Sequence, residues 1–95
     1  MAEIIWSKFA IEDLKNIYDF IAKDSSFYAK RHINKLSERV SQLIKFPNSG
    51  RIVPEFNKTS IRELIEGNYR IVYNINGEKI EIVRIHHSSK SINPD

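Results

Sequence analysis

The hydrophobic periodicity of the chain changes once, near Pro54, and this change limits the folds open to it. Before Pro54, apolar residues recur at steps of three and four, the spacing of one helix face. After Pro54, apolar and polar residues alternate in three short runs, the spacing of half-buried strands. A chain of 95 residues has room for one core, so we expect residues 1–95 to form a single α+β domain.

Two helices are predicted before Pro54. The first covers about residues 8–23, and the Ser7 hydroxyl can cap an unpaired N–H of its first turn. The second covers about residues 27–46, after an Asp24-Ser25-Ser26 segment that offers a new cap, and Pro47 disfavours helix at its end. Because the loop between them is short, the two helices must pack antiparallel as a hairpin.

Four strands are predicted, over residues 3–7, 60–66, 68–75 and 79–86. The element order is therefore β-α-α-β-β-β. We expect an antiparallel helical hairpin packed on one face of a mostly antiparallel, twisted sheet.

The Asn76-Gly77 dipeptide predicts the register of the last two strands, because both residues tolerate a positive φ. A two-residue turn there pairs residues on the helix-covered face: Tyr73 with Ile80, Ile71 with Ile82, and Tyr69 with Arg84. The opposite face is expected to be partly charged and partly open, and to carry Arg70, Val72, Glu81, Val83 and Ile85.

Composition excludes several classes of protein. The chain has no cysteine, which rules out disulfides, thiolate nucleophiles and cysteine-ligated zinc. The longest apolar runs have three residues, such as Ile71-Val72-Tyr73, whereas a membrane span needs about 20. The N-terminus lacks the pattern of a signal peptide. We therefore expect a cytoplasmic protein with no membrane partner. Phosphate-loop, dinucleotide-binding and zinc-protease motifs are absent, so we expect no cofactor.

The second predicted helix is basic within a chain of net charge +3. Its cations accompany a single acid, Glu38, and are Lys30, Arg31, Lys35, Arg39 and Lys45. This pattern is typical of a solvated helix face. It also suits a landing site for an acidic partner or nucleic acid, and composition does not choose between them.

The candidate functional residues lie in the last two strands. His86 and His87 would point to opposite faces of a strand, so they do not suit one metal, and no metal site is expected. His87 could act as an acid or base, or could bond to backbone at the strand end. Arg70 could form a salt bridge with Glu63 or Glu81, or present its guanidinium to a phosphate or an acidic peptide.

Several segments, in order, resemble one known family. They are Trp6-Ser7 with Ala10 and Phe20-Ile21-Ala22, Pro47-x-x-Gly50-Arg51-x-Val53-Pro54-Glu55, Ile61-Arg62-Glu63-Leu64, Tyr69-Arg70-Ile71-Val72-Tyr73, and Val83-Arg84-Ile85-His86-His87-x-x-Lys90. Together they are similar to the RelE/ParE family, the toxin halves of toxin–antitoxin pairs. The Gly-Arg-x-Val-Pro-Glu segment favours the ParE-like branch.

The two branches imply different chemistry. RelE-like members are ribosome-dependent endoribonucleases that cleave mRNA, and in that case Arg70, His87 and Lys90 are the candidate catalytic residues. ParE-like members are described as inhibitors of DNA gyrase without catalysis of their own, and His87 and Lys90 match a histidine and a basic position of that branch. Glu63 stands where a lysine would help RNA cleavage, and a carboxylate there would repel phosphate.

The resemblance therefore predicts a ParE-like toxin that is not an enzyme and inhibits growth by binding gyrase. The alternatives are a RelE-like nuclease acting on ribosome-bound mRNA, and a non-toxic module of the same fold that binds a partner. A cognate antitoxin is the expected partner, and oligomers are expected to form through that complex. The residues expected to contact the target or the antitoxin are Arg62, Arg70, Arg84, His87 and Lys90.

Overall fold

The computed structural model describes residues 2–88, and it is an α+β fold of two helices on a five-stranded sheet. The helices are α1 (Lys8–Ala22) and α2 (Ser26–Ser41), followed by a short 3₁₀ turn, η1 (Gln42–Ile44). The strands are β1 (Glu3–Trp6), β2 (Arg51–Ile52), β3 (Ile61–Glu66), β4 (Tyr69–Asn76) and β5 (Lys79–His87). Their order is β1-β5-β4-β3-β2, and only β1 pairs in parallel, with β5. The predicted fold class is confirmed, while the two-residue β2 was not predicted.

The helices begin at the predicted caps. The Ser7 hydroxyl accepts the Ala10 N–H at 3.0 Å and donates to the Val83 carbonyl at 2.7 Å, so the start of α1 is fixed to β5. The Ser25 hydroxyl accepts the Tyr28 N–H at 3.2 Å at the start of α2. Helix α2 ends at Ser41, earlier than predicted, because the chain tightens into η1 before Pro47.

The main core lies between the helical hairpin and one face of the sheet. Its fully buried large side chains are Leu36, Leu43, Ile71, Tyr73, Ile80 and Ile82. Burial of each side chain of this size contributes about 1.5–3 kcal/mol. The prediction that Ile71 and Tyr73 face the helices is confirmed, and Tyr69 packs against the same core.

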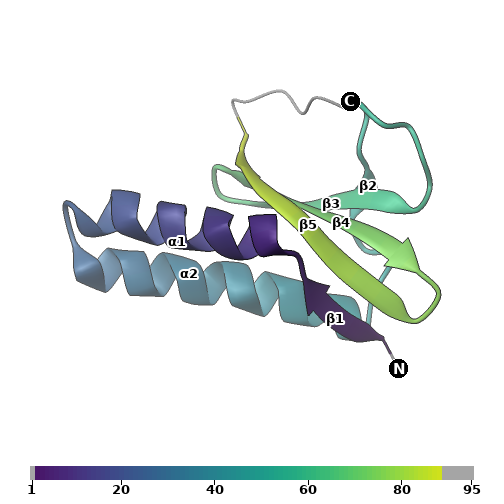
Figure 1. The fold of residues 1–95 in the computed structure, drawn as a ribbon, viewed down its shortest axis with the longest axis horizontal. Coiled ribbons are helices and arrows are strands. Elements are labelled where there is room, and N and C mark those ends of the chain that lie inside the picture. The colour runs from purple at the N-terminus through teal and green to yellow at the C-terminus, as the bar shows by residue number, and fades with distance from the viewer. Residues whose placement is uncertain (1, 89–95) are drawn as a thin grey trace.

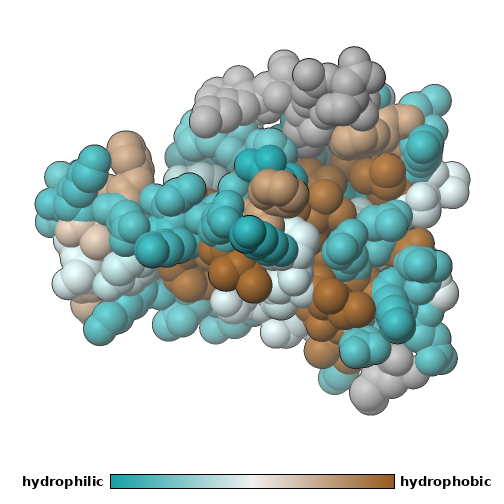
Figure 2. Space-filling model, viewed as in Figure 1, coloured by the Kyte–Doolittle hydropathy of each residue, from teal (hydrophilic) through white to brown (hydrophobic). Residues whose placement is uncertain are grey.

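The antiparallel hairpin extends beyond the sheet at the end where α1 meets α2 (Figure 1). Hydrophilic atoms dominate its visible side, whereas apolar atoms gather over β5 and β1 (Figure 2). No helix within residues 2–88 is long and apolar enough to cross a bilayer.

The predicted register of β4 and β5 is wrong by two residues. Asn76 pairs with Lys79, so the turn consists of Gly77 and Glu78, and Tyr73 pairs with Ile82 rather than Ile80. Gly77 has φ 62° at the first central position, the glycine placement of a type II′ turn, and Asn76 stays in the strand. A shift of two residues leaves each side chain on its predicted face up to Ile82.

A β-bulge corrects the prediction for the rest of β5. Between the Tyr73–Ile82 pair and the Val72–Arg84 pair, Val83 is an extra residue. An extra residue reverses the alternation of side chains beyond it. Ile85 is therefore buried in the helix-side core instead of lying on the opposite face, and Arg84 pairs with Val72 instead of Tyr69.

The sheet face opposite the helices is covered in part: Arg70 and Val72 are buried there, whereas Glu81 is exposed, so the prediction of a partly charged and partly open face is confirmed. The segment between η1 and β3 packs Val53 and Phe56 against Val72, and Val53 is fully buried. The Val53 N–H donates to the Ile61 carbonyl at 3.2 Å, which fixes this segment beside the sheet edge. We call residues 47–60 the covering segment.

Candidate functional site

An ion-pair network centred on Arg70 lies beneath the covering segment. Arg70 Nε donates to Glu63 Oε1, and its two terminal nitrogens donate to the two carboxylate oxygens of Glu55, both at 2.9 Å. Arg51 Nε donates to the other oxygen of Glu63 at 2.6 Å. Glu63 is 1% exposed and Arg70 is 7% exposed, so the centre of the network is buried. The carboxylates of Glu55 and Glu63 each accept hydrogen bonds from a guanidinium group.

The network explains the Gly-Arg-x-Val-Pro-Glu segment in physical terms. A Cβ at Gly50 would lie 2.6 Å from both the Tyr73 hydroxyl and the Glu63 carbonyl, so only glycine fits. The Gly50 N–H donates to the Tyr73 hydroxyl, which donates to the Pro47 carbonyl, each at 2.9 Å. Val53 of this segment is buried, and Glu55 accepts hydrogen bonds from Arg70. These contacts fix the covering segment to the sheet.

Arg70 is engaged within the fold. The hydrogen bonds that Arg70 donates to Glu55 raise the pKa of its guanidinium above the usual value, against the opposing effect of burial. Of the two arrangements considered from the sequence, the structure has the salt bridge with Glu63. Glu55 was not foreseen as a partner, although its place in the Gly-Arg-x-Val-Pro-Glu segment was the available clue.

A second candidate region is a cleft of about 520 Å³ between α1 and the end of β5. Its lining residues are Asp13, Asn16, Ile17, Phe20, Tyr69, Arg84, Ile85 and His87. The structure thus brings two of the predicted residues, Arg84 and His87, to one place.

Asp13 organises one wall of this cleft. Its carboxylate accepts Arg84 Nε at 2.9 Å, Arg84 Nη2 at 3.1 Å and the Ile85 N–H at 2.9 Å. The hydrogen bonds to Asp13 raise the pKa of the Arg84 guanidinium. The Arg84 guanidinium also lies 5.6 Å from the centre of the Phe9 ring, within range of a cation–π contact. Asp13 was missed from the sequence because nothing in the spacing of α1 identifies the strand it meets.

His87 forms the opposite wall through ring contacts. Its imidazole meets the Tyr69 ring edge-on, with ring centres 5.5 Å apart, and Tyr69 meets His32 of α2 in the same manner at 5.2 Å. His87 pairs with Tyr69 in the sheet, while His86 pairs with Arg70. The imidazole of His87, the phenol of Tyr69 and the guanidinium of Arg84 therefore line the same cleft, between α1 and the end of β5.

Comparison with known proteins decides the family. The chain matches the family described as the ParE toxin of the type II toxin–antitoxin system, parDE, over residues 4–92. The protein belongs to the ParE toxin family. It is also 31% identical over 91 residues to Toxin RelE2 of Caulobacter vibrioides, a match covering 95% of this chain and 99% of that one.

Solved structures agree with this assignment. A chromosomal ParDE toxin–antitoxin system from P. aeruginosa matches with a TM-score of 0.76 and 26% identity, over 92% of this toxin and 96% of that chain. The DinJ–YafQ complex of E. coli matches with a TM-score of 0.64 over 94% and 96% of the two chains; at 14% identity, this likeness concerns the fold alone. The chain is thus a type II toxin of the ParE/RelE superfamily, as the ordered motifs predicted.

Two other predicted residues of the toxin, Arg62 and Arg70, do not line the cleft. Arg62 donates to the carbonyls of Thr59 and Gly50, both at 3.0 Å, and so holds the covering segment. Arg70 lies in the buried network, and Lys90 lies outside the described residues. Within residues 2–88, no three His, Asp or Glu side chains are close enough together to hold a metal ion.

Proposed function

We propose that this toxin inhibits growth by binding an essential protein target, with DNA gyrase as the favoured target, and that it has no catalysis of its own. The observation that carries the proposal is the pairing of Arg70 with Glu55 and Glu63. An RNA-cleaving relative would present a basic side chain to phosphate at this position. Here that side chain, Arg70, is already paired with two carboxylates of the same chain.

RNA cleavage makes demands that this arrangement does not favour. It needs a base for the 2′-hydroxyl, an acid for the leaving oxygen, and cations around the phosphate. Arg84, the cation beside His87 in the cleft, is held by Asp13. A phosphate would have to displace the carboxylates bound to Arg70 and Arg84, or be repelled by them. Breaking the buried ion pair of Arg70 would cost about 3–5 kcal/mol.

The cleft supports recognition of a protein instead. Phe20 is 68% exposed at its rim, and Tyr69 and His87 add rings that can pack against an inserted side chain. In this proposal Arg84, His87 and Lys90 contact the target or the antitoxin. Arg62 and Arg70 act indirectly, because they hold the covering segment in place.

A cognate antitoxin is part of the proposal. The P. aeruginosa ParDE system and the E. coli DinJ–YafQ complex are toxin–antitoxin assemblies. We expect a flexible segment of the antitoxin to fold on the toxin's hairpin or in its cleft, and oligomers to form through that complex. Because gyrase acts on chromosomal DNA, this proposal includes a cytoplasmic toxin.

A second function has two observations in its favour. The cleft joins His87, Tyr69 and Arg84, and a relative 31% identical to the toxin is called RelE2. A ribosome-dependent mRNA endoribonuclease could use His87 as acid or base, with Lys90 as a further cation. The remaining alternative is a non-toxic protein of the same fold that only binds a partner. Such a protein would arrest growth neither through gyrase nor through mRNA cleavage.

The deciding experiment compares both targets with matched variants. Purified toxin should inhibit supercoiling or trap cleaved DNA in a gyrase assay, while primer extension on translated mRNA shows no new ends. His87→Ala should abolish gyrase inhibition. His86→Ala, on the neighbouring residue paired with Arg70, should retain it, with folding of both checked by thermal melting. Codon-phased mRNA cuts that vanish in His87→Ala would establish the nuclease, and absence of growth arrest on expression would establish the non-toxic module.

A further inference from the structure

His32 of α2 carries a buried polar atom that the fold leaves unpaired. Among the residues that the structure describes, its Nε2 is the one buried side-chain nitrogen or oxygen without a hydrogen-bond partner. Buried polar atoms in proteins are mostly hydrogen-bonded, because leaving one unpaired costs stability. The place of His32 in the fold therefore needs an explanation other than a hydrogen bond to this nitrogen.

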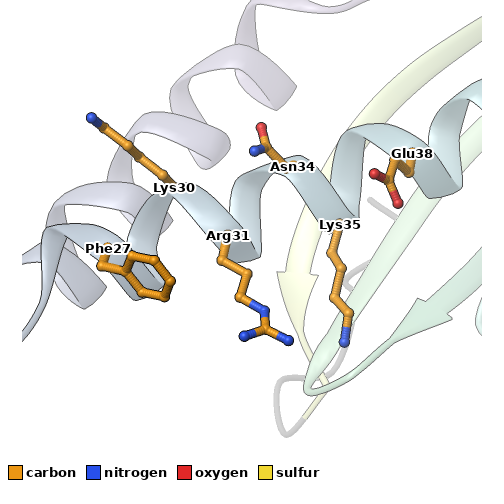
Figure 3. A pocket seen from close by; sticks show the side chains of 6 residues that line it. All are labelled: Phe27, Lys30, Arg31, Asn34, Lys35 and Glu38. Carbon is orange, nitrogen blue, oxygen red and sulfur yellow. The ribbon is translucent and has the colours of Figure 1, made fainter.

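The surroundings of His32 differ from those of its neighbours on the helix. Arg31, Asn34 and Lys35 are exposed and line a hollow of about 460 Å³ along α2 (Figure 3). His32 does not line that hollow; it is half-buried, and its ring meets a ring of the sheet. A Cβ at Gly67, in the turn between β3 and β4, would lie 3.8 Å from His32 Cε1, so the imidazole lies beside this turn.

His32 is the first of three rings in contact. Its imidazole meets Tyr69 edge-on, with ring centres 5.2 Å apart and an angle of 65° between the planes. Tyr69 meets His87 edge-on in turn, at 5.5 Å and 79°. Edge-on ring contacts have a preferred geometry, so each ring restricts the orientation of the next. The three rings connect α2, which contributes no residue to the wall of the cleft, with the imidazole inside the cleft.

The sheet fixes the backbone of His87 but not the orientation of its ring. His87 pairs with Tyr69 across β4 and β5, and just beyond it the Ser88 N–H donates to the Asn68 carbonyl at 2.6 Å. A cross-strand pair places both side chains on the same face of the sheet, close enough to touch. Rotation about the side-chain bonds of His87 is limited instead by side-chain contacts, among them the contact with the Tyr69 ring.

We propose that His32 is a positioning residue for His87 and that it acts through Tyr69. The ring of His32 limits how far the Tyr69 ring can turn toward α2, and the Tyr69 ring holds the His87 imidazole at the wall of the cleft. In this role the ring of His32 matters and its unpaired nitrogen does not. The inference rests on the proposed function, in which His87 contacts the target, and it adds a residue that does not itself line the cleft.

Two substitutions at His32 separate the ring from the nitrogen. His32→Phe keeps an aromatic ring and removes the unpaired nitrogen, whereas His32→Gln keeps a polar side chain and removes the ring. Asn34→Ala, at an exposed position of the same helix, is the matched control. Thermal melting checks that each purified toxin folds, and His32→Leu, which also lacks a ring, replaces His32→Gln if that variant does not fold.

NMR spectra of the imidazole protons report the position of His87 directly. The chain has three histidines, so the signals of His87 are assigned by comparison with His86→Ala and His87→Ala. We expect His32→Gln to shift these signals and to weaken the nuclear Overhauser effect between the rings of Tyr69 and His87, and His32→Phe to preserve both. His32→Phe should also melt at no lower temperature than the unsubstituted toxin, because it removes an unpaired polar atom.

The gyrase assay measures the consequence for function. The loss of one edge-on ring contact weakens binding about two- to tenfold, so His32→Gln should raise the concentration for half-inhibition by about that factor. His32→Phe and Asn34→Ala should inhibit like the unsubstituted toxin.

Three NMR results would overturn the proposal: unchanged His87 signals in His32→Gln, equal changes in Asn34→Ala, or equal changes in His32→Phe. Full inhibition by His32→Gln would also overturn it if His87→Ala abolishes inhibition. Full inhibition by His87→Ala would instead refute the role of that residue in the proposed function, and the NMR comparison would still decide whether His32 positions it.

Discussion

Replacing Arg70 by methionine tests whether the buried network holds the covering segment on the sheet. Methionine keeps most of the apolar stem and removes the charge. Glu63 would then be left with only 1% exposure and a single partner, Arg51, whose side chain is 63% exposed. Glu55 would lose both hydrogen bonds from Arg70, but its side chain is 25% exposed, so water can replace part of them.

The expected cost follows from this difference in burial. Removing one partner of a buried ion pair typically costs about 3–5 kcal/mol, because the other charge stays buried. Arg51 remains on Glu63, so we expect about 3 kcal/mol, at the lower end. For a domain of this size that loss corresponds to a melting temperature roughly 12–24 °C lower.

Arg51→Met is the matched control, since it removes the other arginine from the same carboxylate. An exposed ion pair contributes about 0–1 kcal/mol, so the loss should be small. Urea denaturation followed by fluorescence of the single tryptophan, Trp6, measures both variants. The double variant Arg70→Met/Glu63→Leu should regain most of the stability, because it removes the buried charge as well. If Arg70→Met cost no more than Arg51→Met, the network would not be what holds the segment.

Variants at four further positions test other contacts. Gly50→Ala should destabilise the fold by about 1–3 kcal/mol, and Tyr73→Phe should not rescue it, because the Glu63 carbonyl still lies 2.6 Å from the new Cβ; denaturation of the single and double variants measures this. Burial raises the pKa of the Tyr73 hydroxyl above its ordinary value of 10.0, against smaller effects of Gly50 and a nearby arginine. Stability should therefore fall as the pH rises through that raised pKa, and urea titrations above about pH 10 should show a smaller fall in Tyr73→Phe. Ser7→Ala should cost about 1–2 kcal/mol and Ser25→Ala less, because only the Ser7 hydroxyl also bonds to the sheet; equal melting temperatures would contradict this.

Local patterns in the sequence predicted the elements well. The caps at Ser7 and Ser25, the helix faces and the three later strands depend on neighbours within a few residues, which periodicity records. The helix-covered face of β4 followed from alternation alone. Alternation could not predict the bulge at Val83, because an extra residue cannot be recognised from the types of its neighbours. The bulge reverses which face of the sheet each later side chain of β5 occupies.

The candidate site was harder to predict because its partners are distant in the chain. Arg84 and Asp13 are separated by 71 positions, and Arg70 and Glu55 by 15. The sequence left open whether Arg70 forms a salt bridge and named no partner for Arg84, and only the fold shows that both are paired. The Gly-Arg-x-Val-Pro-Glu segment, which favoured the ParE-like branch, lies in the covering segment, and its residues hold that segment on the sheet.

The pairing of β1 with β5 has a consequence for the synthesis of the toxin. The strand translated first has one neighbour in the sheet, and that neighbour is the last strand to be made. Ser7 likewise bonds to a carbonyl 76 positions away. Contacts of such long range form late, because the intervening chain must be closed into a loop before they contribute. A nascent chain can form the helical hairpin early, but the cleft beside His87 exists only once β5 has left the ribosome. The cleft is therefore among the last parts of the described fold to form.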